Sequence, residues 1–290
     1  MAADVAAASA ATRCGRCGHG VFVKRLLIAG CGDIGIRLAA CLDPTAWAVS
    51  GLRRRAERLP ATIGRISADL LAPASLKAVE SSWDAVVYQA TPDQRTPDAY
   101  RQAYVNGLTA LLARVETERL ILVSSSSVYG QDQGEWVDEE SATEPAAFAG
   151  QLLLESEALA RAVGGLVVRF SGIYGPGRDW LLRQIRSGQA RCRPEPPQWT
   201  NRIHADDCAA VLAHVLSLPA PADLYCASDD APTPRCEVLD WLAEQLDQPR
   251  PERAALEGGQ GKRVCNRRLR DSGFRFQYPD FRHGYGAMLT

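Results

Sequence analysis

The stretch RLLIAGCGDIGIRLAACL, residues 25–42, decides the fold. Its apolar start predicts a buried strand, and the part from Asp33 to Leu42 predicts a helix. Gly30, Gly32 and Gly35 form the pattern G-x-G-x-x-G between them. That pattern is informative only where it follows a strand and opens a helix, which is its context here.

Each position of this turn has a physical role in a dinucleotide site. The first glycine permits a tight turn, the second lets the backbone approach a pyrophosphate, and the third lets helix and strand pack closely. The first helical residues, Asp33 and Ile34, present backbone N–H groups toward an anion. We therefore expect dinucleotide binding; the alternative is an ordinary glycine-containing strand–helix turn.

The rest of the chain alternates apolar strands with helices, which predicts a parallel sheet covered on both faces. The fold class expected is α/β: a Rossmann-type doubly wound parallel sheet with a small C-terminal α/β substrate lobe. Three parts are expected: a disordered extension (1–20), a NAD(P)-binding domain (21–172) and an intertwined substrate-binding lobe (173–290). The helices are predicted at 33–42, 98–117, 148–163, 205–218 and 235–246, and the principal strands at 21–30, 46–52, 65–70, 83–90, 119–127, 165–172 and 224–228.

The end of the second predicted strand selects the cofactor. NAD-binding folds usually place a carboxylate there for the ribose 2′-OH, whereas arginine suits a 2′-phosphate. Here Arg53, Arg54 and Arg55 follow one another, and Glu57 is the first carboxylate. NADP(H) is therefore favoured over NAD(H); the alternative is a solvated basic segment that faces water.

Composition excludes several partners. Among 290 residues, 33 Lys and Arg balance 34 Asp and Glu, so the chain lacks the basic excess typical of nucleic-acid binders. No apolar run is long enough to span a membrane. Nine cysteines without a disulfide framework, and no secretory leader, predict a cytoplasmic, reducing location. Cys14, Cys17 and His19 lack a second ligand pair, so no metal is expected.

Several further motifs occur in a consistent order. They are Asp69-Leu70, Gln89-Ala90-Thr91 after the fourth strand, Asn106 in YVNGLTALL, the serine run 124–127 before Val128-Tyr129-Gly130, the segment RFSGIYGPGR (169–178), the segment NRIHADD (201–207), and a C-terminal GKR-x-x-N-x-R-L…GF…YP pattern (261–279). Together they make the chain resemble an atypical extended short-chain dehydrogenase/reductase, of the NAD(P)-dependent epimerase/dehydratase type, from about Lys24 to Tyr285.

The resemblance implies roles for these positions. It implies that Asp69 contacts the adenine and that Ser125 is the catalytic serine, four residues before Tyr129. It places Arg178 and His204 on the substrate side. The other positions that it assigns to the cofactor are Leu70, Gln89, Ala90, Thr91, Asn106 and Ser124.

The family's acid–base pair, Tyr-x-x-x-Lys, is missing. Ala147 and Gln151 occupy its two positions, and the chain has lysines only at 24, 77 and 262. A substrate proton would then come from Tyr129, His204 or water, and the sequence does not choose among them. Tyr129 also fits a packed aromatic, and His204 fits a structural hydrogen-bonding residue better than a catalytic one.

Two functions remain open. The first is an NAD(P)-binding oxidoreductase of the epimerase/dehydratase type, acting on a small molecule for which the resemblance implies sugar-like chemistry. The second is a catalytically silent NADP(H)-binding redox sensor. The resemblance also implies a homodimer, and neither a nucleic acid nor a membrane is expected as a partner.

Overall fold

The structure is a computed structural model that describes residues 23–255 and 257–289. The expected extension 1–20, with Cys14, Cys17 and His19, lies outside the described residues. Helices of the described chain are all too short or too polar to cross a membrane.

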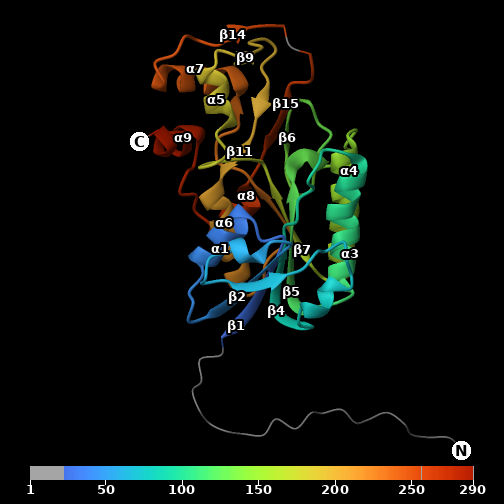
Figure 1. Cartoon of the computed structure of the whole chain (residues 1–290). Helices are drawn as coiled ribbons and strands as arrows, with labels where there is room; N and C mark the ends of the chain where they lie inside the picture. Colours follow the sequence, from blue (N-terminus) through green and yellow to red (C-terminus); the bar gives the residue numbers. More distant parts are fainter. Residues whose placement is uncertain (1–22, 256, 290) are drawn as a thin grey trace, which may run out of the picture.

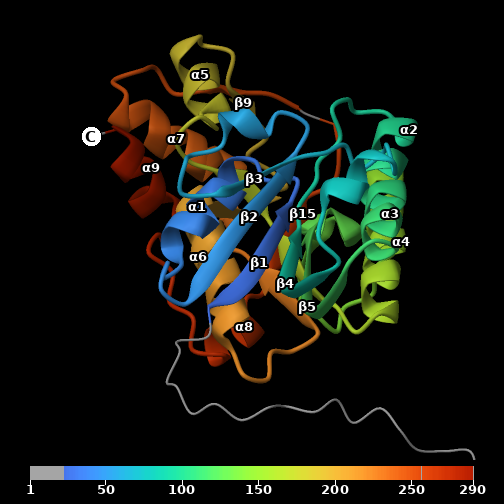
Figure 2. The same cartoon turned by 60° about the horizontal axis from the view of Figure 1, so that its bottom comes forward.

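Seven parallel strands of the described chain form the central sheet, in the order β12-β7-β5-β4-β1-β2-β3. Figure 2 shows β3, β2, β1, β4 and β5 side by side. The strands are β1 (Lys24–Ala29), β2 (Trp47–Arg53), β3 (Gly64–Ser67), β4 (Ser82–Tyr88), β5 (Glu116–Ser125), β7 (Leu166–Phe170) and β12 (Leu224–Ala227). The order reverses between β1 and β4, and in such sheets ligands bind at this switch point, beyond the carboxyl ends of the strands.

Helices cover both faces of the sheet, as expected. Figure 1 shows α1 and α6 on one face and α3 and α4 on the other. Alternation along β1 explains the two layers: Leu26 and Ile28 pack in the core beneath α1 and α6, whereas Leu27 and Ala29 pack in the core beneath α3. The four helices are α1 (Asp33–Cys41), α3 (Gly107–Leu112), α4 (Phe148–Ala162) and α6 (Ala205–Ser217).

The predicted single helix 98–117 is wrong in two respects. It is divided into α2 (Pro97–Tyr100), the π-helix η3 (Arg101–Asn106) and α3, and it ends at Leu112. The polar residues 116–118 extend β5 instead, because Glu116 N donates to Ser81 O beside the start of β4. Polar residues at the end of a strand lack the apolar pattern that would have predicted them. The third strand is also shorter than predicted: it ends at Ser67, so that Asp69 and Leu70 lie beyond the sheet.

The C-terminal part forms a smaller lobe above the carboxyl ends of the strands (Figure 1), although β12 and α6 from this part complete the sheet layers. The remaining helices are α5 (Trp180–Arg186), α7 (Arg235–Gln245), α8 (Arg267–Asp271) and α9 (Phe281–Leu289). The remaining strands are β6 (Gln133–Val137), β8 (Gly172–Tyr174), β9 (Arg191–Cys192), β10 (Trp199–Thr200), β11 (Arg202–His204), β13 (Thr233–Pro234), β14 (Glu252–Arg253) and β15 (Gly261–Val264).

A disulfide within this lobe was not foreseen. Cys192 of β9 and Cys236 of α7 are bonded, with their Cα atoms 5.3 Å apart. The two cysteines are 44 residues apart in the chain, so their spacing carried no signal. The expectation of a chain without a disulfide framework therefore needs this correction.

Candidate functional site

A cavity of about 730 Å³ lies at the switch point of the sheet. Four segments that leave the carboxyl ends of β1, β2, β3 and β4 form its walls, and the start of α2 and part of η3 close one side. Its lining residues are Gly30–Gly32, Leu52–Arg55, Ala68–Leu71, Ala90–Gln94, Thr96, Asp98, Ala99, Gln102 and Ala103. Neighbouring parallel strands thus bring together segments that are far apart in the chain.

The three glycines of the turn have the geometry that a dinucleotide site requires. Gly30 has φ +77°, and a Cβ there would lie 2.5 Å from Ala90 Cα. A Cβ on Gly35 would lie 2.9 Å from Ile28 Cγ2, so this glycine lets α1 pack on β1. A Cβ on Gly32 would meet nothing closer than 3.9 Å, which leaves its backbone open to the cavity. The residues present therefore fit a dinucleotide phosphate group.

The three arginines at the end of β2 and directly after it, Arg53 to Arg55, line the same cavity. Arg53 Nη1 donates to Cys31 O at 3.2 Å, which places a guanidinium beside the glycine turn. Arg54 forms an ion pair with Asp93 at 2.7 Å, across the cavity from β2. Burial raises the pKa of the Cys31 thiol to about 11, although Arg53 opposes this shift, so the thiol stays protonated near neutral pH.

Some of the other predicted cofactor residues line the cavity, and the rest lie outside its lining. Asp69, Leu70, Ala90 and Thr91 line the cavity. Gln89 lies beneath the turn, where its Nε2 donates to Gly30 O at 3.5 Å. Ile34 is buried, Asn106 is exposed on η3, and neither belongs to the cavity lining.

The serines at 124–127 do not line this cavity. Ser124 is buried, and its Oγ donates to Glu157 Oε1 at 2.6 Å. Glu157 in turn forms a buried ion pair with Arg169 at 2.6 Å, so Ser124 belongs to an internal polar network. Ser125 is half-buried, and its Oγ accepts a hydrogen bond from Ser127 N at 3.2 Å.

The positions of the missing acid–base pair hold no titratable group. Ala147 directly precedes α4, and Gln151 Nε2 donates to Pro145 O at 3.2 Å. The Tyr129 hydroxyl makes hydrogen bonds within the protein: it donates to Asp138 O at 2.7 Å and accepts from Arg169 Nη1 at 2.8 Å. Burial raises the pKa of Tyr129, which disfavours loss of its proton. Lys262 Nζ donates to Tyr129 O and lies on β15, not on α4.

His204 has a structural role. It precedes α6 and its Nδ1 accepts a hydrogen bond from Asp206 N at 3.2 Å. Its ring is buried against Tyr278, with the ring centroids 4.0 Å apart. Burial lowers the pKa of His204, so the ring is neutral and can accept this bond at neutral pH. The structural interpretation of this residue therefore has direct support in its contacts.

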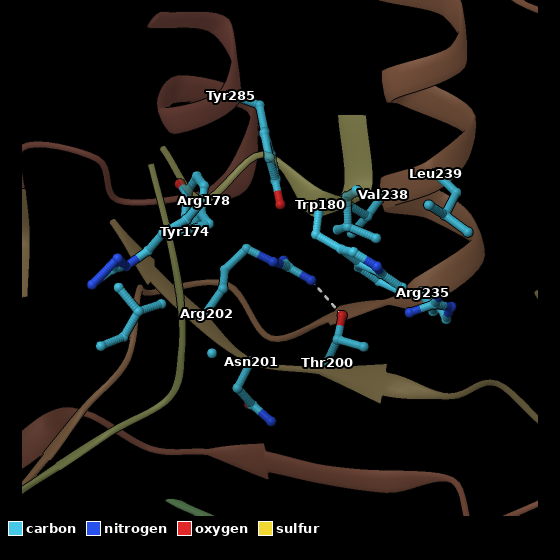
Figure 3. Close-up of a pocket in the computed structure, with 13 residues that line it drawn as sticks. Tyr174, Arg178, Trp180, Thr200, Asn201, Arg202, Arg235, Val238, Leu239 and Tyr285 are labelled. Carbon is cyan, nitrogen blue, oxygen red and sulfur yellow. Dashed lines mark hydrogen bonds between the residues drawn. The ribbon is translucent and has the colours of Figure 1, made fainter. Parts of the chain in front are cut away.

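A second cavity, of about 210 Å³, lies in the C-terminal lobe (Figure 3). Of the two residues predicted on the substrate side, Arg178 lines this cavity and His204 does not. It is also lined by Trp180, Arg202, Arg235 and Tyr285, for which the sequence predicted no role in a site. Arg202 stands inside the quoted NRIHADD segment, but a motif alone does not show that its side chain is buried beside a cavity.

Comparison with known proteins agrees with this geometry. Residues 26–224 match the sequence profile of the NAD dependent epimerase/dehydratase family. The chain belongs to this family. The match spans the glycine turn, the central sheet and both helical layers, so the family assignment and the Rossmann-type fold are both confirmed.

Individual relatives cover almost the whole chain. A candidate NAD-dependent epimerase/dehydratase from Methylobacillus flagellatus is 37% identical and superposes with a TM-score of 0.79, covering 92% of this chain and 98% of its own. Protein YeeZ from Escherichia coli (strain K12) is 27% identical over 277 residues, 89% of this chain and 97% of its own. A 3-diazoavenalumate denitrifying reductase from a Streptomyces species is 28% identical over 253 residues, 78% of this chain and 83% of its own.

Proposed function

We propose that this protein is an NADP(H)-dependent oxidoreductase acting on a small molecule. The observation that carries the proposal is the position of Arg53 beside the open backbone of Gly32, at the end of β2. When bound, the nicotinamide supplies or accepts a hydride. The diphosphate would be held by the glycine turn, and the ribose 2′-phosphate by Arg53 and Arg54.

Charge supports NADP(H) over NAD(H). The segment 53–55 presents guanidinium groups where NAD-binding relatives of this fold carry a carboxylate. Guanidinium groups bind phosphate oxygens bidentately, whereas a carboxylate would repel the additional phosphate. Arg54 is held in place by Asp93, and this ion pair is exposed enough to rearrange around a ligand.

The missing Tyr-x-x-x-Lys pair limits the chemistry that the chain can supply. The Ser125 hydroxyl accepts a hydrogen bond from Ser127 N, so its own hydrogen stays available to polarise a substrate oxygen. Tyr129 and His204 are both held in structural hydrogen bonds, so the proton is best supplied by water. A reduction that needs no strong general base fits this set of residues. The relative named as a denitrifying reductase supports a reduction rather than an oxidation.

A catalytically silent NADP(H) sensor is the second candidate, because Ala147 and Gln151 cannot move a proton. The two candidates share cofactor binding and differ only in turnover. NADPH consumption on a panel of small carbonyl and unsaturated compounds separates them. Saturable NADPH binding without consumption on any compound would favour the sensor.

The cofactor assignment is tested by Arg53→Glu. We expect this substitution to weaken NADPH binding more than NADH binding, because only NADPH carries the 2′-phosphate. Arg58→Glu is a matched control, since Arg58 is exposed on the same segment and does not line the cavity. Equal losses of both coenzymes in Arg53→Glu would contradict the 2′-phosphate assignment.

A further inference from the structure

The second cavity contains a buried arginine with an unused hydrogen-bond donor. Arg202, on β11, is only 5% exposed. Its Nη2 donates to Thr200 Oγ1, whereas its Nη1 has no hydrogen-bond partner among the described residues. Figure 3 shows the guanidinium reaching between Thr200 and Tyr285. Leaving a buried cationic donor unpaired is costly, so this arrangement points to an anionic partner.

The charges around this cavity are one-sided. Its lining contains three arginines, Arg178, Arg202 and Arg235, and no carboxylate among the described residues. Arg178 is paired with Asp33 outside the lining, at 3.5 Å. Arg235 lies over the Trp180 ring at 5.8 Å, and its Nε donates to Arg191 O. Arg202 is therefore the lining cation with the most direct need of a counterion.

Asp229 is an acidic group that interacts electrostatically with Arg202. Its backbone N–H donates to Arg202 O at 2.7 Å, but its buried Oδ2 has no partner among the described residues. Burial raises the pKa of Asp229 to about 8, although Arg202 opposes this shift. The raised pKa favours the neutral form of this carboxyl, so it compensates the charge of Arg202 only in part.

Apart from Thr200 and Asn201, the other side chains that line the cavity are apolar or aromatic. Leu181 lies beside Trp180 on α5, Val238 and Leu239 face them from α7, and Tyr285 of α9 completes the enclosure. The volume of about 210 Å³ is below the range of about 300–1,000 Å³ of sites for drug-sized ligands. A small acid with an apolar body fits this volume.

We propose that this cavity binds the carboxylate of a small, largely apolar organic acid, with Arg202 as its principal partner. A carboxylate oxygen matches the one buried donor of the lining arginines that has no partner among the described residues, Nη1 of Arg202. The cavity lies beyond β7 and β8, above the carboxyl edge of the sheet. That this acid is the substrate rests on the proposed function; the binding itself does not.

The test is calorimetric titration of the full chain, without coenzyme, with benzoate, phenylacetate and cinnamate. At least one of these acids is expected to bind. The uncharged amide of that acid is expected to bind at least about tenfold more weakly, because a hydrogen bond to a charged group is lost. Phenyl phosphate is the comparison for a dianion. No binding by any of the three acids, equal affinity for acid and amide, or tighter binding of the phosphate would overturn the proposal.

Variants assign the effect to Arg202. Arg202→Gln is expected to weaken acid binding about tenfold or more, and Arg202→Lys to weaken it less, because a lysine keeps the charge without the planar fork. Arg186→Gln, at an exposed arginine of α5, is the matched control and should leave the affinity unchanged. Unchanged acid binding in Arg202→Gln would contradict the assignment.

NADPH titration of the same variants controls for folding and separates this proposal from the proposed function. Arg202→Gln should retain the NADPH affinity of the wild type, because Arg202 does not line the larger cavity. Acid binding without NADPH binding would overturn the proposed function alone. NADPH binding without acid binding would overturn the proposal for the second cavity alone.

Discussion

Arg178 Nη1 lies 3.5 Å from Asp33 Oδ2, and this ion pair connects the cavity of the C-terminal lobe with the residue that follows the glycine turn. Asp33 is the first residue of α1, directly after the glycine turn, and Arg178 lines the cavity of the C-terminal lobe. Arg37 also pairs with Asp33, at 3.0 Å. The negative charge next to the expected diphosphate position is therefore balanced by two arginines from different parts of the fold.

Arg178→Gln tests this balance. With one arginine removed, the Asp33 carboxylate opposes an incoming diphosphate more strongly. Because the pair is partly exposed, we expect NADPH binding to weaken by about two- to fivefold, the range of a surface ion pair. Titration at low and high salt should show a smaller effect at high salt. A loss that is independent of salt would contradict an electrostatic role.

The glycine turn separates a folding requirement from a binding requirement. Gly30→Ala places a Cβ on a residue at φ +77° and 2.5 Å from Ala90 Cα, so it should destabilise the fold by more than about 1 kcal/mol. Gly32→Ala adds a methyl group that meets no close atom, so stability should be retained while NADPH binding weakens. Denaturant unfolding and NADPH titration measure the two effects. Unchanged NADPH affinity in Gly32→Ala would place the diphosphate elsewhere.

The buried network of α4 predicts a large difference between two glutamates. Glu157→Ala leaves Arg169 buried without its partner and should cost about 3–5 kcal/mol of unfolding free energy. Glu155→Ala, on the same helix as Glu157, removes an exposed ion pair with Arg101 of η3 and should cost less than about 1 kcal/mol. Urea unfolding of both variants measures these costs. Similar losses for both would mean that the network contributes little.

Asp229 predicts a pH dependence of stability. Its pKa is raised from 3.8 to about 8 in the folded chain, so the folded state keeps a proton that the unfolded state has lost between these values. Stability should therefore fall as pH rises from about 4 to about 8, since the unfolded chain binds fewer protons there. Asp229→Asn, which cannot ionise, should flatten this slope in thermal unfolding between pH 5 and 8. An unchanged slope would show that the carboxyl is ionised in the folded protein.

The sequence predicted the sheet and the glycine turn because both rest on local patterns. Apolar strands such as 25–29 and the G-x-G-x-x-G spacing follow directly from short stretches of chain. The predicted helix end at Thr117 was wrong, and the helix ends at Leu112 instead. Polar residues 116–118 join β5 through a contact with Ser81 that no local pattern records. Local patterns therefore predict elements better than they predict their ends.

The candidate site was predictable only in part, for the same reason. Asp69 and Arg53 both line the larger cavity, because each lies at or just beyond the carboxyl end of a strand that the sequence predicted. Ser124, by contrast, has its hydroxyl on the buried Glu157, which lies 33 residues further along the chain. The place of Arg202 in the lining of the smaller cavity was not predicted, because its burial comes from tertiary packing, which a motif does not show.

The central claim is that the glycine turn and the arginines after β2 bind a nicotinamide dinucleotide phosphate. Calorimetric titration of the wild-type chain with NADPH and, separately, with NADH tests this claim most directly. The account predicts saturable binding of NADPH at one site per chain and weaker binding of NADH. Absence of binding heat with both coenzymes, together with no displacement of unfolding temperature, would contradict it.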